Sequence, residues 1–184
     1  MTKALRFVSR NEYKIQEMGQ FFHDSAIEVI PVKNKLEELQ TTDIEKLVKD
    51  KAVKAFKLIG RPLFVEHTGL KLEYLNGYPG GLTQILWDSL EADKFCELFG
   101  QTDRNKLSAE TVIGYVDGRC FHLFKGEVRG TVSATPRGDR SFQWDCVFIP
   151  EEETRTFSEM GVAKNEISMR NIAVKKFIAF LENQ

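Results

Sequence analysis

The sequence predicts an α/β fold in which helices flank a mixed β-sheet. The first segments alternate as strand, helix and strand, which is the beginning of a β-α-β unit. Further along, two segments with strand-like patterning are joined by Asp117-Gly118, a pair typical of a tight antiparallel hairpin. A sheet that contains both a crossover and a hairpin has parallel and antiparallel strands, so we expect a mixed sheet.

The chain is long enough to form one well-packed domain. It has 184 residues, of which 42% are apolar and 29% charged, as in an ordinary globular protein. A chain of this length buries roughly 70% of the surface that it exposes when unfolded, so its core needs no disulfide or metal staples. Because no repeat or linker-like stretch divides the chain, we expect residues 1–184 to form a single domain.

The first half of the chain contains the predicted β-α-β unit and a second helix. Residues 4–9 alternate apolar and polar side chains, as a strand does. Ser9 followed by Glu12 is a capping-box pattern and predicts that a helix begins there. Residues 27–31 are predicted to form the next strand. Residues 43–59 have apolar side chains at helical spacing and predict the second helix.

The second half begins with a short predicted strand, residues 63–66, which ends in the polar string Glu66-His67-Thr68-Gly69. The remaining segments follow from turn residues and apolar spacing. They are a turn-rich loop at 76–81, a helix at 83–99, the hairpin strands 111–116 and 119–133, a loop at 134–144, a strand at 146–149 and a final helix at 164–181.

Charge and cysteine content exclude several classes of protein. The chain carries 26 Lys and Arg against 27 Asp and Glu, so it lacks the broad basic surface that nucleic-acid polymers require. Cys96, Cys120 and Cys146 form no C-x-x-C pair, and we expect buried free thiols in a reducing cytosol. No apolar run has the length of a secretory signal or a membrane span, which predicts a cytoplasmic protein without membrane association.

The first candidate site is the start of the first helix, at residues 9–14. A helix N-terminus attracts phosphate through its unpaired backbone N–H groups and partial positive charge. Asn11 adds side-chain donors there, and Lys14 adds a full charge one turn into the helix. The alternative interpretation is a capped surface helix that carries an exposed lysine.

The second candidate site lies at the end of the third predicted strand. Glu66, His67 and Thr68 could gather there around a divalent cation, together with Glu45 from the start of the preceding helix. Two or more oxygen ligands plus substrate phosphates suffice for Mg²⁺. The alternatives are that Glu45 only stabilises a helix start and that Glu66 is a solvent-facing strand end.

Two further segments carry groups that could bind a planar ring. The loop before the last strand presents Phe142 and Trp144, whose faces can stack on a heterocycle, and Asp145, which can accept a ring N–H. The start of the final helix carries Ser168 and Arg170, which can donate to ring carbonyls. The alternatives are aromatic side chains that pack into the core and an ordinary charged helix face.

Five short motifs follow one another along the chain. They are S/T-x-N-x-x-K at residues 9–14, E-D-S/T-G-L at 66–70, N-G-x-P-G at 76–80, F-G-W/Y-D-P-x-F at 142–148 and K-N-x-x-S-H-R at 164–170. In order and spacing they resemble the inosine and xanthosine triphosphate pyrophosphatase family, whose members hydrolyse non-standard purine nucleoside triphosphates. The resemblance covers nearly the whole chain.

The resemblance implies an elongated α/β fold with a long mixed sheet, two lobes and a central nucleotide cleft, in a homodimer. It also implies cleavage between the α- and β-phosphates to give a nucleoside monophosphate and pyrophosphate, assisted by Mg²⁺, with Mn²⁺ as an alternative ion. The residues that it assigns are Ser9, Asn11, Lys14 and Thr68 to the phosphates, Glu45 and Glu66 to the metal, Lys14, Glu66 and His67 to catalysis, and Phe142, Trp144, Asp145, Lys164, Ser168 and Arg170 to the base.

Four positions depart from the family's motifs. His67 stands where the family has an Asp that binds metal and helps to activate water, so a negative charge is missing and we expect weaker Mg²⁺ binding. Met169 replaces a His that helps to bind the purine carbonyl, so the base preference is expected to differ. Gln143 and Cys146 replace Gly and Pro in the segment that carries Phe142, Trp144 and Asp145, which we call the base loop. These two replacements change the backbone freedom of the base loop.

The leading hypothesis is a Mg²⁺-dependent nucleoside triphosphate pyrophosphatase with an altered metal site and altered base selectivity. In the first alternative, His67 has abolished hydrolysis, and the chain is a nucleotide-binding sensor or partner subunit. In the second, the chain keeps only the fold and is a structural dimer without nucleotide affinity. The leading hypothesis requires that Lys14 and Glu66 face the same hollow.

Overall fold

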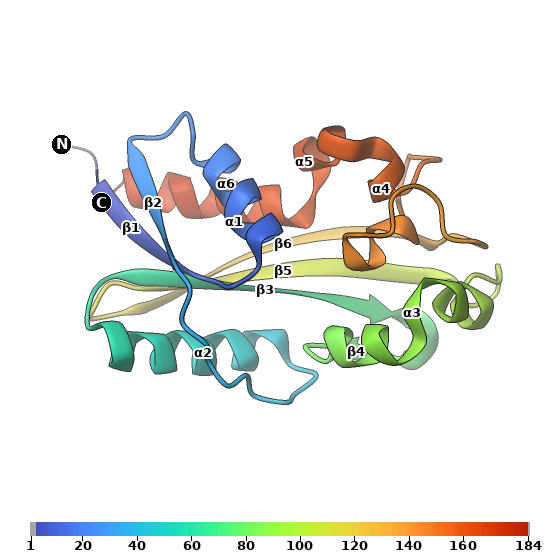
Figure 1. The fold of residues 1–184 in the computed structure, drawn as a ribbon, viewed down its shortest axis with the longest axis horizontal. Helices are drawn as coiled ribbons and strands as arrows, with labels where there is room; N and C mark the ends of the chain where they lie inside the picture. The colour runs from blue at the N-terminus through green and yellow to red at the C-terminus, as the bar shows by residue number, and fades with distance from the viewer. Residues whose placement is uncertain (1–2, 184) are drawn as a thin grey trace.

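The computed structural model describes residues 3–183, and within them seven strands form one open, mixed sheet (Figure 1). The strands are β1 (Lys3–Val8), β2 (Ile27–Val32), β3 (Leu63–Leu72), β4 (Pro79–Gly80), β5 (Lys106–Val116), β6 (Phe121–Val132) and β7 (Phe148–Pro150). Their order in space is β2, β1, β3, β5, β6, β7, with β4 paired to β3. β1 pairs in parallel with β2 and β3, and the other pairs are antiparallel, which confirms the predicted mixed sheet.

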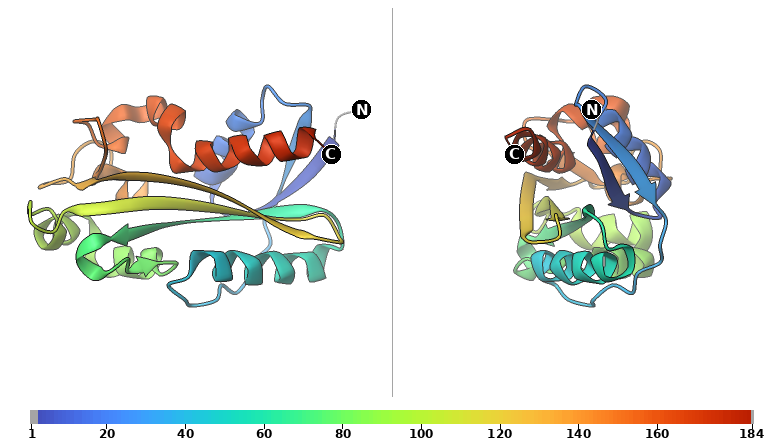
Figure 2. Two further views of the ribbon diagram at one scale, coloured as in Figure 1. Left: turned by 180° about the vertical axis from the view of Figure 1, so that it is seen from behind. Right: turned by 90° about the vertical axis from the view of Figure 1, so that its left-hand side faces the viewer.

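Helices cover both faces of the sheet, and the long strands β3, β5 and β6 make the molecule elongated (Figures 1 and 2). α2 (Ile44–Ile59) and α3 (Thr83–Phe99) lie on one face, and α1 (Glu12–Phe21) and α6 (Met169–Glu182) lie on the other. The shorter helical segments are η1 (Glu73–Leu75), η2 (Gln143–Cys146), α4 (Phe157–Met160), η3 (Gly161–Ala163) and α5 (Lys164–Ile167). Among the described residues, no helix has the length and apolar character needed to cross a membrane.

Three clusters of buried apolar side chains hold these layers together. One lies between α2 and the sheet and includes Val48 and Val112. A second lies between the sheet, α1 and α6, and includes Phe64 and Phe177. The third includes Phe95 and fills the opposite end of the molecule, between the sheet, α3 and η2.

The first helix begins later than the capping-box pattern predicts. Asn11 is the N-cap, since its Oδ1 accepts the backbone N–H of Lys14 at 3.2 Å. Ser9 remains in the loop, where its Oγ accepts the N–H of Asn11 at 3.2 Å. Glu12 pairs with Lys33 instead of closing a box. The predicted capping box at Ser9 is therefore wrong, because Asn11 competes for the same role and lies next to the helix.

Several other elements differ from their predicted bounds, and β5, for example, begins at Lys106 and not at Thr111. β3 continues to Leu72, because its polar residues pair with β5 in antiparallel register, His67 opposite Val112. The final helix is interrupted at Ser168, whose backbone is extended (ψ 149°) and whose side chain accepts the N–H of Asn171. Ser168 thereby caps α6 and separates it from α5.

The cysteines are free thiols, as predicted, but they differ in exposure. Cys96 and Cys146 are buried, whereas Cys120 is exposed at the β5–β6 hairpin. The expectation that Cys120 is buried is therefore wrong, because the residue lies in the turn and not in the paired part of the strands.

β1 and β3 pair over only two residues and then separate, which opens the sheet where the polar motifs lie. Arg6 and Phe7 of β1 lie opposite Leu63 and Phe64 of β3. β4 joins the same edge of β3 only from Leu70 onward. Along residues 65–69, none of the described strands pairs with this edge of β3. Openings of this kind, beyond the carboxyl end of a parallel strand, are common ligand sites in α/β proteins.

Candidate functional site

A hollow of about 420 Å³ lies at this opening, and we call it the polar hollow. Its walls come from the β1–α1 loop, the loop before α2, α2 itself and the middle of β3. The predicted site residues that line it are Ser9, Asn11, Lys14, Glu66, His67 and Thr68. Lys14 and Glu66 do face the same hollow, because Lys14 Nζ lies 2.7 Å from Glu66 Oε2.

Glu66 is the centre of a buried charge network. It is 2% exposed. Besides Lys14, Arg170 donates from Nε and Nη2 to Oε1 at 3.3 and 3.2 Å, and the hydroxyl of Thr68 donates to the same oxygen. Burial alone would raise the pKa of Glu66, but the charges of Lys14 and Arg170 outweigh it and hold this pKa well below its usual range. Glu66 is thus a carboxylate at neutral pH and not a solvent-facing strand end.

The polar hollow also concentrates positive charge beside the start of α1. Its lining includes Arg10, Lys14, Lys35 and Lys51, and the first backbone N–H groups of α1 are beside it. Burial lowers the pKa of Lys14, and the ion pair with Glu66 opposes that effect. Cationic side chains next to a helix N-terminus favour an anionic ligand with several charges, such as a polyphosphate.

His67 follows Glu66 on β3, so its side chain leaves the strand towards the opposite face, where α2 lies. It is 8% exposed, and its buried Nε2 has no hydrogen-bond partner among the described residues. Burial, aided by the charge of Lys14, lowers the pKa of His67 to about 4. The imidazole is therefore neutral at pH 7, and one ring nitrogen is free to accept a proton or to bind a cation.

Glu38 is a site residue that sequence reasoning missed. It lies in the loop before α2 and lines the polar hollow. Lys51 of α2 holds it, with Nζ 2.5 Å from Glu38 Oε1. Burial raises the pKa of Glu38, but the charge of Lys51 lowers it, and the lowering prevails. The one signal in the sequence was the acidic pair Glu37-Glu38 shortly before the second helix, and such pairs are common on surfaces.

Glu45 does not line the polar hollow. Its Oε1 pairs with Lys125 Nζ of β6 at 2.6 Å, and nearly half of its side chain is exposed. The structure therefore does not bring Glu45 next to Glu66, as the predicted metal site requires, because the rotation of α2 about its axis turns its first acidic residue towards β6. Glu38 lies in the hollow instead, so the second carboxylate comes from the loop and not from the helix.

The predicted base-binding residues line a small cavity next to the polar hollow, and we call it the aromatic cavity. Its lining includes Phe142, Trp144, Asp145, Lys164, Ser168 and Arg170. It shares Lys14, Thr68 and Gln143 with the polar hollow, so the two spaces adjoin. Its volume is about 20 Å³. Ligand pockets usually exceed roughly 300 Å³, so a ring can enter only after side chains move.

Phe142 is the side chain placed to open the aromatic cavity. Its ring lies 5.0 Å from that of Tyr13, and Lys164 Nζ lies 4.3 Å from its centroid. Trp144, by contrast, is buried and packs edge-on against Phe148 at 5.8 Å. The two aromatic residues therefore differ: Phe142 has an accessible face, whereas Trp144 mainly belongs to the core.

Polar groups of the aromatic cavity are paired with one another. Lys164 Nζ lies 2.5 Å from Asp145 Oδ2 and 3.0 Å from Glu17 Oε1. Burial raises the pKa of Asp145, and the charge of Lys164 opposes this rise. Glu17 also accepts from Arg170, which places the same guanidinium between this cavity and Glu66. A ring that enters must exchange hydrogen bonds with this network.

The base loop retains a backbone shape that suits glycine. Gln143 has a φ of 45°, in the left-handed region that side chains rarely adopt. Its side chain donates to Gln84 Oε1, and both residues line the polar hollow. Met169, the other notable departure from the motifs, is 4% exposed and packs in the core at the end of the aromatic cavity.

The polar hollow contains donors of the kinds that bind divalent cations. The carboxylates of Glu38 and Glu66 and the unpartnered nitrogen of His67 line one space. Mg²⁺ is commonly bound by one or two carboxylates plus substrate phosphates, so two acidic residues suffice. A nitrogen donor suits Mn²⁺ and later first-row metals better than it suits Mg²⁺.

Comparisons with known proteins identify the family of this chain. A sequence model of the Ham1 family matches residues 5–180. A dITP/XTP pyrophosphatase of Methanopyrus kandleri is 34% identical over 96% of this chain and 95% of its own length. One of Thermococcus kodakarensis is 32% identical over 97% of both chains. The structure of a HAM1 protein from Coxiella burnetii has the same fold, with a TM-score of 0.84 at 24% identity over 99% of this chain and 100% of its own. The family resemblance drawn from the five motifs is thus confirmed, and the chain belongs to the Ham1 family.

Proposed function

We propose that this chain hydrolyses nucleoside triphosphates with non-standard purine bases to nucleoside monophosphates and pyrophosphate. The observation that carries the proposal is that Lys14 and Glu66 meet in a polar hollow that adjoins the aromatic cavity. A triphosphate in the first space would place its base in the second. The names of the relatives, dITP/XTP pyrophosphatases, support this reaction and this substrate class.

In the proposed complex, the phosphates bind at the start of α1. The backbone N–H groups of that helix, with Ser9 and Asn11, line the hollow on one side, and Thr68 lines it on the other. Lys14 supplies a full positive charge between them. Phosphoryl transfer relies mainly on position and charge neutralisation, so these groups provide much of what the reaction needs.

Glu38 and Glu66 are the residues that would hold a divalent cation, Mg²⁺ or Mn²⁺. When bound, the ion would neutralise phosphate charge and polarise the phosphorus–oxygen bonds. Both carboxylates pair with lysines, Glu38 with Lys51 and Glu66 with Lys14, so these ion pairs would have to open for the two residues to hold a cation.

His67 is the candidate for the group that takes the proton from the attacking water. Water oxygen forms a bond to the α-phosphorus, the bond to the oxygen that bridges the α- and β-phosphates breaks, and pyrophosphate leaves. The water proton goes to the free nitrogen of His67, which lines the same hollow as Lys14 and Glu66. Imidazole would thereby replace the family's Asp in this step.

The base would be held in the opened aromatic cavity. Phe142 offers a face for stacking, and Asp145, Lys164, Ser168 and Arg170 offer polar groups around it. Met169 has no N–H to donate, so one hydrogen bond to a purine carbonyl is missing. We therefore expect base selectivity that differs from a strict preference for inosine.

Replacing Lys14 tests the phosphate site. Lys14→Met should lower kcat/KM for pyrophosphate release by about 10²-fold or more, because a charge that neutralises the transition state is lost. The matched control is Lys33→Met, which removes an exposed lysine that pairs with Glu12 outside the hollow, and it should retain full activity. Pyrophosphate release is measured across a panel of nucleoside triphosphates with Mg²⁺ and then with Mn²⁺. Equal activity of the two variants would contradict the proposed site.

Variants at position 67 test the metal and proton roles separately. His67→Ala should lower turnover strongly while nucleotide affinity stays similar, and unchanged turnover would eliminate the proton role. His67→Asp restores a negative charge, so it should raise Mg²⁺-dependent activity and lower the preference for Mn²⁺. Calorimetric titration of the two ions without nucleotide gives the same preference independently of activity.

The sensor alternative predicts nucleotide binding without pyrophosphate release under either ion, and the structural-dimer alternative predicts no nucleotide affinity. The same substrate panel distinguishes both from the proposed enzyme. A cytoplasmic location and a homodimeric state belong to the proposal as well. Sedimentation equilibrium of the full chain measures the second, and a monomer at all concentrations would contradict it.

A further inference from the structure

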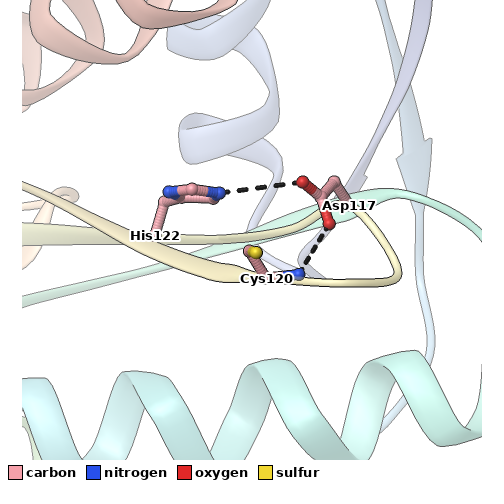
Figure 3. Close-up of side chains that lie close together, drawn as sticks. All are labelled: Asp117, Cys120 and His122. Carbon is pink, nitrogen blue, oxygen red and sulfur yellow. Dashed lines mark hydrogen bonds and ion pairs between the residues drawn. The ribbon is translucent and has the colours of Figure 1, made fainter.

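A second group of metal-ligating side chains lies at the β5–β6 hairpin, at the opposite end of the sheet from α3 (Figures 1 and 3). It consists of Asp117, Cys120 and His122, and we call it the hairpin cluster. Each residue offers one ligand atom, and these atoms lie within 4.8 Å of one another. None of the three residues lines the polar hollow or the aromatic cavity. The proposed hydrolysis therefore leaves this cluster without a role.

The hairpin turn fixes the orientation of Asp117. Its Oδ1 accepts the backbone N–H groups of Arg119 and Cys120 at 2.7 and 2.8 Å. These two hydrogen bonds close the turn and leave Oδ2 directed towards His122 (Figure 3). The carboxylate is thus positioned by the backbone, and a ligand would not have to order it.

The imidazole of His122 is held in place by aromatic neighbours. Its ring centroid lies 4.6 Å from that of Phe180 and 6.0 Å from that of Tyr115. Its Nε2 is buried and has no hydrogen-bond partner among the described residues. Such apolar packing around a ligand ring restricts its movement and limits access of water to the nitrogen.

The space between His122 and Asp117 matches the spacing of two ligands on one cation. Nε2 and Oδ2 are 3.7 Å apart, which is too long for a hydrogen bond. Two ligands about 2.0 Å from one tetrahedral ion are roughly 3.3 Å from each other. A small inward shift of two side chains would therefore complete the contact with an ion between them.

Cys120 adds a third donor and determines which ions the cluster suits. It is an exposed free thiol whose sulfur lies on the same side of the hairpin as the other two ligand atoms (Figure 3). Sulfur, imidazole nitrogen and carboxylate oxygen together favour Zn²⁺ and similar transition metals over Mg²⁺ or Ca²⁺. Three protein ligands leave a fourth position for water.

We infer that Asp117, Cys120 and His122 form a second cation site, for Zn²⁺ or a similar transition-metal ion, at the tip of the β5–β6 hairpin. The bound ion joins the turn to the first residues of β6 and is independent of the proposed hydrolysis. The competing explanation is an ion pair between His122 and Asp117 that needs no metal.

Cobalt substitution tests this site in the full chain after removal of metals with a chelator. Co²⁺ bound to a thiolate gives a near-ultraviolet charge-transfer band, which a site made only of carboxylates and imidazole, such as the polar hollow, does not give. The band should saturate at one ion per chain and disappear when Zn²⁺ is added. Cys96 and Cys146 are buried and should not contribute to it.

Single substitutions identify the ligands. Cys120→Ser should abolish the band, and His122→Asn should lower Zn²⁺ affinity by about tenfold or more. The matched control is Arg119→Ala, which lies in the same turn but offers no ligand and should bind as the unchanged protein does. Circular dichroism checks that each variant is folded. Pyrophosphate release by Cys120→Ser should equal that of the unchanged chain, which separates this site from the proposed function.

Two results would overturn the inference. The first is a folded chain that gives no charge-transfer band with Co²⁺. The second is a band or a Zn²⁺ affinity that Cys120→Ser and His122→Asn leave unchanged. Either result would assign the Asp117–His122 contact to an ion pair alone.

Discussion

At Glu66, one buried carboxylate contacts two cations, Lys14 Nζ and the guanidinium of Arg170. Glu66 and Arg170 are nearly excluded from water, and the side chain of Lys14 is partly exposed where it lines the polar hollow, so the charge of Glu66 helps to make the burial of Arg170 tolerable. The network therefore has a role in stability besides its proposed role in binding phosphate and metal.

Glu66→Gln should measure that role, because it removes the charge while it keeps the shape. At pH 7 we expect the free energy of unfolding to fall by about 3 kcal/mol, since the buried Arg170 and the partly buried Lys14 lose the charge of Glu66, while Arg170 keeps its contact with Glu17. The measurement is urea denaturation. The control is Glu12→Gln, whose partner Lys33 is exposed, and it should change little.

The loss of stability that Glu66→Gln causes should depend on pH. The pKa of Glu66 in the folded chain lies below its usual value of 4.5. Its stabilising charge is therefore fully present above pH 4.5 and is lost as the pH falls towards the folded pKa. The difference in stability between the unchanged chain and Glu66→Gln should shrink below pH 4.5. A difference that stays constant down to pH 3 would show that the charge of Glu66 contributes nothing.

The sequence predicted the site residues that belong to compact motifs, but it could not place those that depend on a helix rotation or a loop path. Lys14 and Glu66 follow from a helix start and a strand end, and they meet as expected. Glu45 and Glu38 are both acidic residues near the start of α2. Only the packing of α2 on β3 and β5 decides which of them lines the hollow.

Among the elements, the loop that carries Glu38 is held in place by the turn around β4. The N–H of Gly81 donates to the carbonyl of Thr42 at 3.0 Å. Gly80 has a φ of 56°, and a Cβ built on it would lie 2.1 Å from Thr42 O. This close backbone contact keeps residues 34–43 against the sheet, and therefore keeps Glu38 at the hollow.

Gly80→Ala should therefore impair both stability and turnover. A left-handed backbone costs a side chain about 1–2 kcal/mol, and the clash with Thr42 adds to that cost by displacing the loop. Gly77→Ala is the matched control, because Gly77 has a φ of 88° but open space around it. It should show the backbone cost alone and retain turnover. Equal losses of turnover in the two variants would show that the loop contact does not position Glu38.

The predicted elements were correct where local pattern and packing agree. The β-α-β unit and the Asp117-Gly118 hairpin follow from turn residues and from apolar spacing, which act over a few residues. The extent of β3 does not follow from such local patterns, because its polar residues pair with β5. The break in the final helix does not follow from them either, because Ser168 caps α6. Long-range pairing is invisible in a short window of sequence.

At the scale of the whole molecule, the polar hollow and the aromatic cavity are lined by segments far apart in the sequence. α1 and β3 contribute from one side, and Gln84, Gln143 and the base loop contribute from the other. The sequence predicted a cleft through its family resemblance, but the separation of β1 from β3 after two paired residues is a property of the folded sheet.

A nucleotide that spans both spaces should stabilise the segments that line them together. A non-hydrolysable triphosphate analogue at 100 times its Kd should raise the free energy of unfolding by about 2.7 kcal/mol. Amide hydrogen exchange should slow at the start of α1, in residues 34–38 and in residues 142–146 at the same ligand concentration. Protection limited to α1 would mean that the aromatic cavity does not receive the base.

The alternation of side chains along β3 has a consequence for how such a site can change over time. Glu66 points to the face with Arg170 and α1, whereas its neighbour His67 points to the face with α2. An exchange at position 67 therefore leaves every partner of Glu66 in place. Under the proposed function, a single substitution at position 67 would change the ion preference and the proton acceptor and leave the ion pairs of Glu66 with Lys14 and Arg170 as they are.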